Sequence, residues 1–310
     1  MSANTEVDRP SSASEDGDVE LEMELPDDVS FMNAEDLTEL CIDVCETQDA
    51  AYLKEKICPH SAFEVDAADE NGYTPLQYAV TFGSFECFKV LVDAKANPAA
   101  KASDGSTCLH IAAQYGFEQF VQPLLAANVA LEEEMPSGSR ALGIALLNKH
   151  AAFVKQLVLH KCDLNYRRAD SCKVAKSQIP LQIAAGLKNI ELFTILLEGG
   201  ANPLIEIEDQ PTTLMQDLVR RKQFDFLDAV ENSYNSLGGG EQKGLVWNEM
   251  TSGYPVFFDS LYEDDIDVLE YLVARKADLA QCDQAGSPAL FVAAFESNFE
   301  AVEFILSQSW

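Results

Sequence analysis

The side chains best suited to metal binding or to proton transfer near neutral pH are the four histidines, His60, His110, His150 and His160. His60 and His160 have no cysteine or histidine partner at the spacing that zinc sites use. His150 falls in a turn between two helical segments, which favours a structural role. The sequence therefore predicts no metal site, and no pattern in it calls for a cofactor.

Cysteine is the other side chain that could bind metal or act as a nucleophile. The chain has eight: Cys41, Cys45, Cys58, Cys87, Cys108, Cys162, Cys172 and Cys282. They are scattered, mostly at helical positions, and no two form a Cys-x-x-Cys pair. We expect reduced thiols that pack as small apolar groups.

The motifs of common enzyme classes are absent from the sequence. It contains no Gly-x-x-x-x-Gly-Lys loop, no Gly-x-Gly-x-x-Gly and no His-Glu-x-x-His. The glycines at 238–240 lack the flanking strand, helix and lysine of a nucleotide site, so we interpret them as a linker. Acidic residues are abundant, but abundance without a shielded pocket does not shift a pKa usefully. We expect no catalysis in this chain.

The elements that must position these side chains come from a phrase that returns after 33 positions, in which residues 72–79 reappear as residues 105–112. Gly72 suits a tight turn with positive φ, Thr74 can cap a helix, and Pro75 fits the first helical turn. Apolar residues then recur at helical spacing in two successive stripes. One such unit is too small to bury both stripes, so neighbouring units must stack.

The 33-residue period with a Gly-x-Thr-Pro-Leu opening resembles the ankyrin repeat. The resemblance implies an all-α solenoid of stacked antiparallel helix pairs joined by short hairpin turns. It also implies that the ring of His110 bridges backbone groups of adjacent repeats. The segment 36–58 has two apolar helical stripes and is interpreted as an N-terminal cap.

The repeat register divides the chain into segments. We predict a disordered acidic tail at 1–33, a repeat block with its cap at 34–231, a Gly-rich insertion or hinge at 232–246, and further ankyrin-like repeats at 247–310. The clearest copies are 69–101, 102–134, 135–167 and 177–208, and a degenerate copy follows at 209–231. Leu214 lies 33 positions after Leu181 and is assigned to the same place in the repeat. Whether the array continues through 209–246 stays open.

The net charge of −31 excludes some partners. Residues 1–33 hold ten acids and one base, so −22 remains on the repeats. Binding to nucleic acid requires clustered lysine and arginine, and we expect none. A basic protein partner is compatible with this charge, as is a surface that is simply well solvated. No apolar run is long enough for a membrane helix and the start is unlike a signal sequence, so we expect a cytoplasmic protein, with the nucleus as the alternative.

Four residues are candidates for partner binding: Tyr73, Phe82, Tyr115 and Leu187. Phe82 and Tyr115 are 33 positions apart, Leu187 has the corresponding place in a later copy, and Tyr73 lies on the adjacent hairpin tip. Exposed aromatic residues are enriched at binding hot spots. The alternative is that these side chains complete the packing between repeats, which we favour for Phe82 and Leu187.

Two positions are candidates for modification. Asn165 follows Asp163 by two residues and Leu157 by eight, which resembles the asparagine-hydroxylation context of ankyrin proteins. The favoured alternative is turn chemistry, because asparagine tolerates left-handed geometry. Ser12 has the Ser-x-x-Glu context of an acid-directed kinase site.

Together these features indicate a non-catalytic intracellular adaptor or scaffold that binds protein segments on the concave ankyrin surface. The rival interpretation is the regulatory ankyrin portion of a larger enzyme or channel whose functional domain lies beyond residue 310. A histone-chaperone-like role is a weaker third hypothesis.

Overall fold

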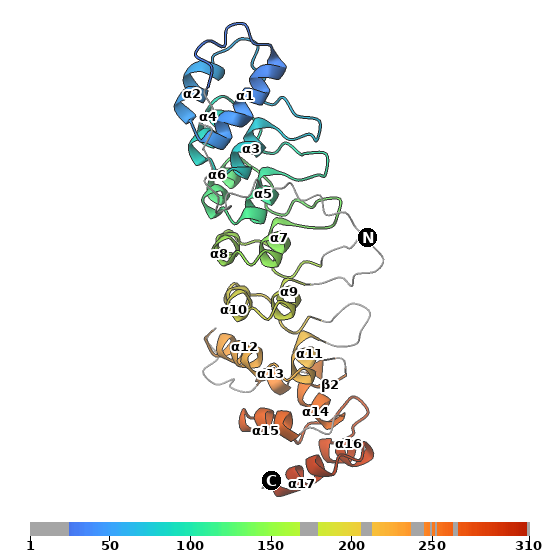
Figure 1. Cartoon of the computed structure of the whole chain (residues 1–310). Helices are drawn as coiled ribbons and strands as arrows, with labels where there is room; N and C mark the ends of the chain where they lie inside the picture. Colours follow the sequence, from blue (N-terminus) through green and yellow to red (C-terminus); the bar gives the residue numbers. More distant parts are fainter. Residues whose placement is uncertain are drawn as a thin grey trace, which may run out of the picture.

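The computed structural model describes residues 25–167, 179–205, 213–236, 245–248, 250–251, 253–262 and 266–308. The helices form pairs that stack in one elongated column, and the hairpin loops between pairs project to one side (Figure 1). This is the all-α solenoid of antiparallel helix pairs that the ankyrin resemblance implies. In these ranges, no helix is long and apolar enough to cross a bilayer.

The first helices of the pairs lie next to the hairpin loops and form what we call the inner face. They are α1 (Ala34–Thr47), α3 (Pro75–Thr81), α5 (Cys108–Tyr115), α7 (Ala141–Leu147), α9 (Pro180–Gly186), α11 (Leu214–Arg220), α14 (Asp259–Tyr262, preceded by the 3-10 helix η3, Val256–Phe258) and α16 (Ala289–Phe295).

The second helices form the opposite, outer side of the column (Figure 1). They are α2 (Ala50–Tyr52, continuing into the π-helix η1, Leu53–Ile57), α4 (Phe85–Asp93), α6 (Val121–Ala126, preceded by the 3-10 helix η2, Glu118–Phe120), α8 (Ala151–Leu159), α10 (Ile190–Glu198), α12 (Phe224–Ser236), α15 (Ile266–Ala274) and α17 (Phe299–Ser307).

Side-chain caps set where the first helices begin. Thr74 caps α3 and Pro75 is its first residue, as the sequence predicts, and Gln77 completes a capping box with Thr74. Thr213 and Gln216 form the same box on α11. The cap makes Met215, not Leu214, the counterpart of Leu181, because each is the second residue of its helix. The assignment of Leu214 was therefore wrong by one position.

One continuous core runs along the column between the two layers of helices. Aromatic side chains join neighbouring pairs: the rings of Phe88 and Phe120 meet edge to face with centroids 5.1 Å apart, and those of Phe193 and Phe226 do so at 4.9 Å. Both members of each pair are buried and come from adjacent second helices. Each helix pair therefore depends on its neighbours for its interior.

The end of the predicted tail packs on the N-terminal cap. Val29 is buried against the core, and the Tyr52 hydroxyl donates a hydrogen bond to the Pro26 carbonyl. Asn33 caps α1, where it forms a capping box with Asp36. The structured part thus begins inside the range 1–33 that the sequence assigns to the tail. Residues 1–24 lie outside the described residues.

The stack continues across the predicted hinge. Helix α11 packs on η3 and α14, so the fifth and sixth repeats share an interface. On the outer side, Arg275, the residue directly after α15, pairs with Asp228 (2.7 Å) and Glu231 (3.0 Å) of α12. The short helix α13 (Leu245–Asn248) and an antiparallel hairpin of β1 (Met250–Thr251) and β2 (Tyr254–Pro255) lie between these repeats in sequence. The glycines at 238–240 lie outside the described residues.

Candidate functional site

Aromatic side chains gather on the inner face over α3 and α5; we call Tyr73, Tyr78, Phe82, Tyr115 and Phe117 the inner-face aromatic cluster. The rings of Tyr78 and Phe82 stack with centroids 6.1 Å apart and an interplanar angle of 23°, and Tyr73 lies 6.0 Å from Tyr78. Tyr115 stacks on Phe117 at 5.9 Å. All five side chains are half-buried, so each presents part of its ring to solvent.

The turn after α3 joins the two halves of this cluster. A Cβ atom added to Gly83 would lie 2.9 Å from the Phe117 ring, so that ring covers the turn directly after Phe82. Gly83 has φ of +69°, a conformation that glycine adopts without strain. The absence of a side chain here is what lets Phe117 close against the preceding repeat.

Carboxylates hold the tyrosine hydroxyls of the cluster. Tyr78 donates to Asp69 Oδ2 at 2.8 Å, and Tyr73 donates to Asp104 Oδ2 of the next hairpin at 3.3 Å. Burial first, and then the bond to Asp69, raises the pKa of Tyr78 to about 12. The hydroxyls are therefore neutral donors near pH 7 and not phenolate nucleophiles.

The structure brings together three of the four predicted partner-binding residues. Tyr73, Phe82 and Tyr115 belong to the cluster, whereas Leu187 lies two repeats away at the end of α9. All four also pack on the core, so packing and partial exposure coexist. Their role in binding stays a prediction. Sequence analysis missed Tyr78 and Phe117, although Tyr78 is four residues before Phe82 and so lies on the same helix face.

Two histidines link adjacent repeats. The ring of His110 lies 3.0 Å from the Thr107 hydroxyl and 3.1 Å from the Glu133 carbonyl of the next hairpin, which confirms the bridging position implied by the ankyrin resemblance. Burial lowers the pKa of His110, so its neutral form is favoured. His150 reaches back to the Gln114 carbonyl at 2.9 Å. Both rings are occupied by structural contacts.

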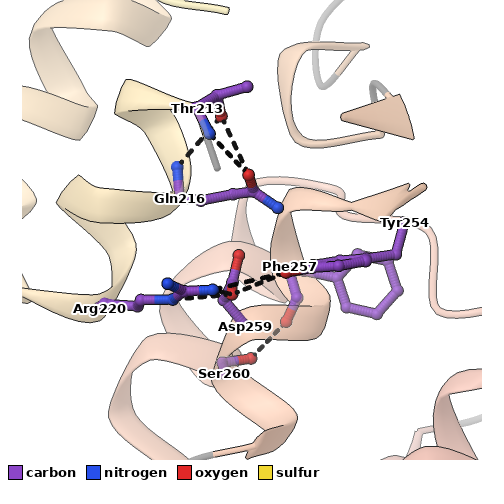
Figure 2. Close-up of polar contacts among 7 residues, drawn as sticks. All are labelled: Thr213, Gln216, Arg220, Tyr254, Phe257, Asp259 and Ser260. Atoms are coloured by element: carbon purple, nitrogen blue, oxygen red, sulfur yellow. Dashed lines mark hydrogen bonds and ion pairs between the residues drawn. The ribbon is translucent and has the colours of Figure 1, made fainter. Parts of the chain in front are cut away.

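Asp259 on α14 is the only buried carboxylate in the ranges that the structure describes. Arg220 extends from α11 and donates to Asp259 Oδ1 at 2.6 and 2.9 Å, with Tyr254 3.4 Å from the same oxygen (Figure 2). Burial raises the pKa of Asp259, while the hydrogen bonds from Arg220, Tyr254 and Gln216 oppose that rise. This ion pair joins the fifth and sixth repeats and gives the buried carboxylate a partner of opposite charge.

Buried thiols gather where the cap meets the first repeat. Cys41, Cys45 and Cys87 are buried, and Cys58 is half-buried. Hydrogen bonding to Cys41 and burial raise the pKa of Cys45. Across the described residues, no three histidine, cysteine or acidic side chains are grouped as metal ligands would be. The grouping therefore has the environment of packed, unreactive thiols.

Asn165 lies exposed in the hairpin after α8. Its Oδ1 accepts a hydrogen bond from the Asn202 backbone N–H of the next repeat at 2.9 Å, and its own N–H donates to Asp163 Oδ1 at 2.9 Å. Its φ is not positive, so left-handed geometry does not explain the asparagine. Hydroxylation of Asn165 stays a prediction, and Ser12 lies outside the described residues.

Comparisons with known proteins agree with this architecture. Family profiles described as "Ankyrin repeats (3 copies)" and "Ankyrin repeats (many copies)" match residues 109–207 and 53–92. The tyrosine-protein kinase Shark of Drosophila melanogaster is 32% identical over 117 residues, which is 38% of this chain and 12% of that protein.

Two further relatives show the same partial coverage. A Caenorhabditis elegans homologue of transient receptor potential cation channel subfamily A member 1 is 39% identical over 87 residues, 27% of this chain and 7% of the channel. The putative ankyrin repeat protein L371 of Acanthamoeba polyphaga mimivirus is 22% identical over 265 residues, 83% of this chain and 28% of that protein. The chain thus spans less than a third of the length of these curated relatives. The profiles and the stacked helix pairs together show that the chain contains ankyrin repeats.

Proposed function

We propose that this chain is a non-catalytic adaptor or scaffold that binds a segment of another protein across the inner-face aromatic cluster. Ankyrin repeats generally mediate protein–protein interactions. The observation that carries the proposal is the cluster itself, in which half-buried aromatic residues from two successive repeats adjoin on one face. Tyrosine and phenylalanine provide large contact areas with few rotatable bonds, which suits a binding hot spot.

The charge around the cluster supports a basic partner segment. Asp69 and Asp104 accept hydrogen bonds from its tyrosines, and the neighbouring Glu70 is exposed. The chain as a whole carries −31. A basic segment would be attracted to this face at low salt and would bind more weakly as salt screens the carboxylates. We place the protein in the cytoplasm, with the nucleus as the alternative, and imaging of a tagged chain tests that placement.

Affinity capture followed by mass spectrometry tests the proposal. The wild-type chain is compared with a Tyr73→Ala/Tyr115→Ala variant and with a chain that lacks residues 1–24, which keeps Val29 and the Asn33 cap in place. The matched control is Phe299→Ala, because Phe299 is 79% exposed on α17, far from the cluster. We expect the double variant to lose partners that the control keeps. Retention of every partner by the double variant would remove the proposed surface.

A second candidate function is the regulatory ankyrin segment of a longer protein. The observation that favours it is that the matched regions cover 12% of a kinase and 7% of a channel homologue. Sequencing of the full transcript tests this candidate. A reading frame that continues past residue 310 into a catalytic or channel domain supports it, and a stop codon after residue 310 rejects it.

A further inference from the structure

A pocket of about 230 Å³ opens between the last two repeats, at the opposite end of the column from the inner-face aromatic cluster. Tyr262 contributes from the end of α14, Phe291 and Phe295 from α16, and Val292 is buried beneath them. Asp283 lines the pocket from the hairpin loop before α16. The pocket therefore joins two first helices and one loop, as a groove on the inner face would.

The aromatic walls of the pocket are unusually open to solvent. Tyr262 is 46% exposed, Phe291 57% and Phe295 75%. The rings of Phe291 and Phe295 lie close to parallel, at 21°, with centroids 6.2 Å apart. Grouped, exposed aromatic surface on a soluble protein commonly marks an interaction site. These rings offer flat π-faces to whatever enters the pocket.

The pocket is also negatively charged. Among the residues that the structure describes, its lining includes Asp283 and Glu296 and no lysine or arginine. The Ser287 N–H donates to Asp283 Oδ1 at 2.8 Å, which fixes that carboxylate in the loop. Burial first, and then the charges of Asp283, Glu296 and Asp259, raise the pKa of Tyr262. The pocket thus combines π-faces with a field that attracts a cation and repels an anion.

We propose that this pocket binds an arginine side chain of a partner protein. A guanidinium group is planar and weakly hydrated, so it stacks on aromatic rings while its N–H groups donate to carboxylates. An uncharged apolar side chain would leave Asp283 and Glu296 unused. The inference rests on the proposed interaction function but involves none of the cluster residues. The two can therefore fail separately.

The test uses a fluorescently labelled peptide of repeated Arg-Gly-Gly triplets, measured by anisotropy at low salt with the full chain. The control peptide carries citrulline in place of each arginine, which keeps the planar shape and removes the charge. We expect the arginine peptide to bind and the citrulline peptide to bind at least roughly tenfold more weakly. Equal binding of the two peptides would overturn the proposal.

Variants of the chain locate the binding. Phe295→Ala and Glu296→Gln remove one ring and one charge from the pocket, and we expect each to weaken binding roughly threefold to thirtyfold. The matched controls are Phe299→Ala and Glu300→Gln, which change an exposed ring and an exposed charge of the same repeat outside the pocket. We expect the controls to bind like the wild-type chain. Equal losses in pocket and control variants would show general attraction to an acidic surface, which contradicts the proposal.

Two further measurements separate the alternatives. If a second copy of the chain covers the pocket, analytical ultracentrifugation will show self-association that Phe295→Ala abolishes, and the arginine assignment is then wrong. Tyr73→Ala/Tyr115→Ala should bind the peptide like the wild-type chain. If that double variant loses partner capture but still binds the peptide, both the partner-binding cluster and the arginine pocket are supported. If the double variant still captures every partner and still binds the peptide, the aromatic cluster is not the partner-binding surface, but the pocket proposal stands. If the double variant no longer binds the peptide, the pocket is not the peptide-binding site.

Discussion

The ion pair between Arg220 and Asp259 predicts a pH-dependent loss of stability when Arg220 is replaced by methionine. The Asp259 residue is 2% exposed, so its carboxylate has little solvent to replace the lost partner. Removal of one partner from a fully buried pair costs about 3–5 kcal/mol. Because the Arg220 side chain is 39% exposed, solvent already screens this pair, and we expect a loss of about 1–3 kcal/mol at pH 7.

The sign of the pH dependence follows from the raised pKa of Asp259. The folded chain holds this proton more tightly than the unfolded chain, whose pKa is near 3.8. The contribution of Asp259 to stability is therefore greatest below that value and falls as pH rises through the folded pKa. Loss of Arg220 moves the folded pKa further up. The destabilisation by Arg220→Met should then grow as pH rises through the wild-type folded pKa of Asp259.

Tryptophan fluorescence during urea unfolding measures this effect locally. Trp247 is fully buried in α13, which packs on η3, and a Trp310→Phe background removes the other tryptophan. Adding Asp259→Asn should recover part of the stability lost in Arg220→Met at pH 7. Arg221→Met is the control, because Arg221 is exposed directly after α11 and forms a local ion pair with Asp217 of the same repeat. A loss that is independent of pH, or no recovery by asparagine, would refute the reasoning.

Three other predictions concern stability and thiol reactivity. Gly116→Ala should destabilise the chain by about 2 kcal/mol, because φ of Gly116 is +76° and the new Cβ would lie 2.5 Å from the His150 ring. Gly186 has open space around it, so Gly186→Ala should be neutral or stabilising by up to about 1 kcal/mol. Thermal unfolding of the two variants measures the difference. Cys108 is buried and its pKa is raised to about 12, so it should react with maleimide much more slowly than the partly exposed Cys282. Pulse labelling followed by mass spectrometry measures the two rates, and equal rates would contradict this prediction. Asn165→Ala removes the hydrogen bond from the Asn202 N–H and should cost about 1 kcal/mol in urea unfolding, and the peptide mass from cells shows whether Asn165 is hydroxylated.

Local chemistry explains why much of the fold is predictable from the sequence. Thr74, Pro75 and Gln77 carry the start of a helix in their own side chains, and α3 begins where they place it. The stacking of pairs follows from apolar stripes that one repeat cannot bury alone. The family profiles at 53–92 and 109–207 cover regions where this signature is strong.

Features that depend on contacts between repeats cannot be predicted from local sequence in this way. Gly83 and Gly116 have positive φ in the turn between the helices of a pair, but Lys149 and Lys188 adopt the same left-handed conformation in later repeats. A search for glycine therefore misses those turns. The one-residue shift from Leu214 to Met215 became visible only through the Thr213 cap.

The candidate sites were predictable only in part, for the same reason. Phe82 and Tyr115 stood out by their shared phase in the repeat and Tyr73 by its place on the hairpin tip, whereas Phe117 joins the cluster by packing over Gly83. The pocket around Phe291 and Phe295 depends on Tyr262 of the preceding repeat, which no local pattern connects to them.

Hydrogen exchange of backbone amides, with and without a captured partner, tests most directly whether the inner face binds proteins. The account predicts that the partner slows exchange at residues 69–83 and 104–117 and leaves the outer helices α8 and α10 unchanged. Slowed exchange on those outer helices, with none at the two hairpins and their first helices, would contradict it.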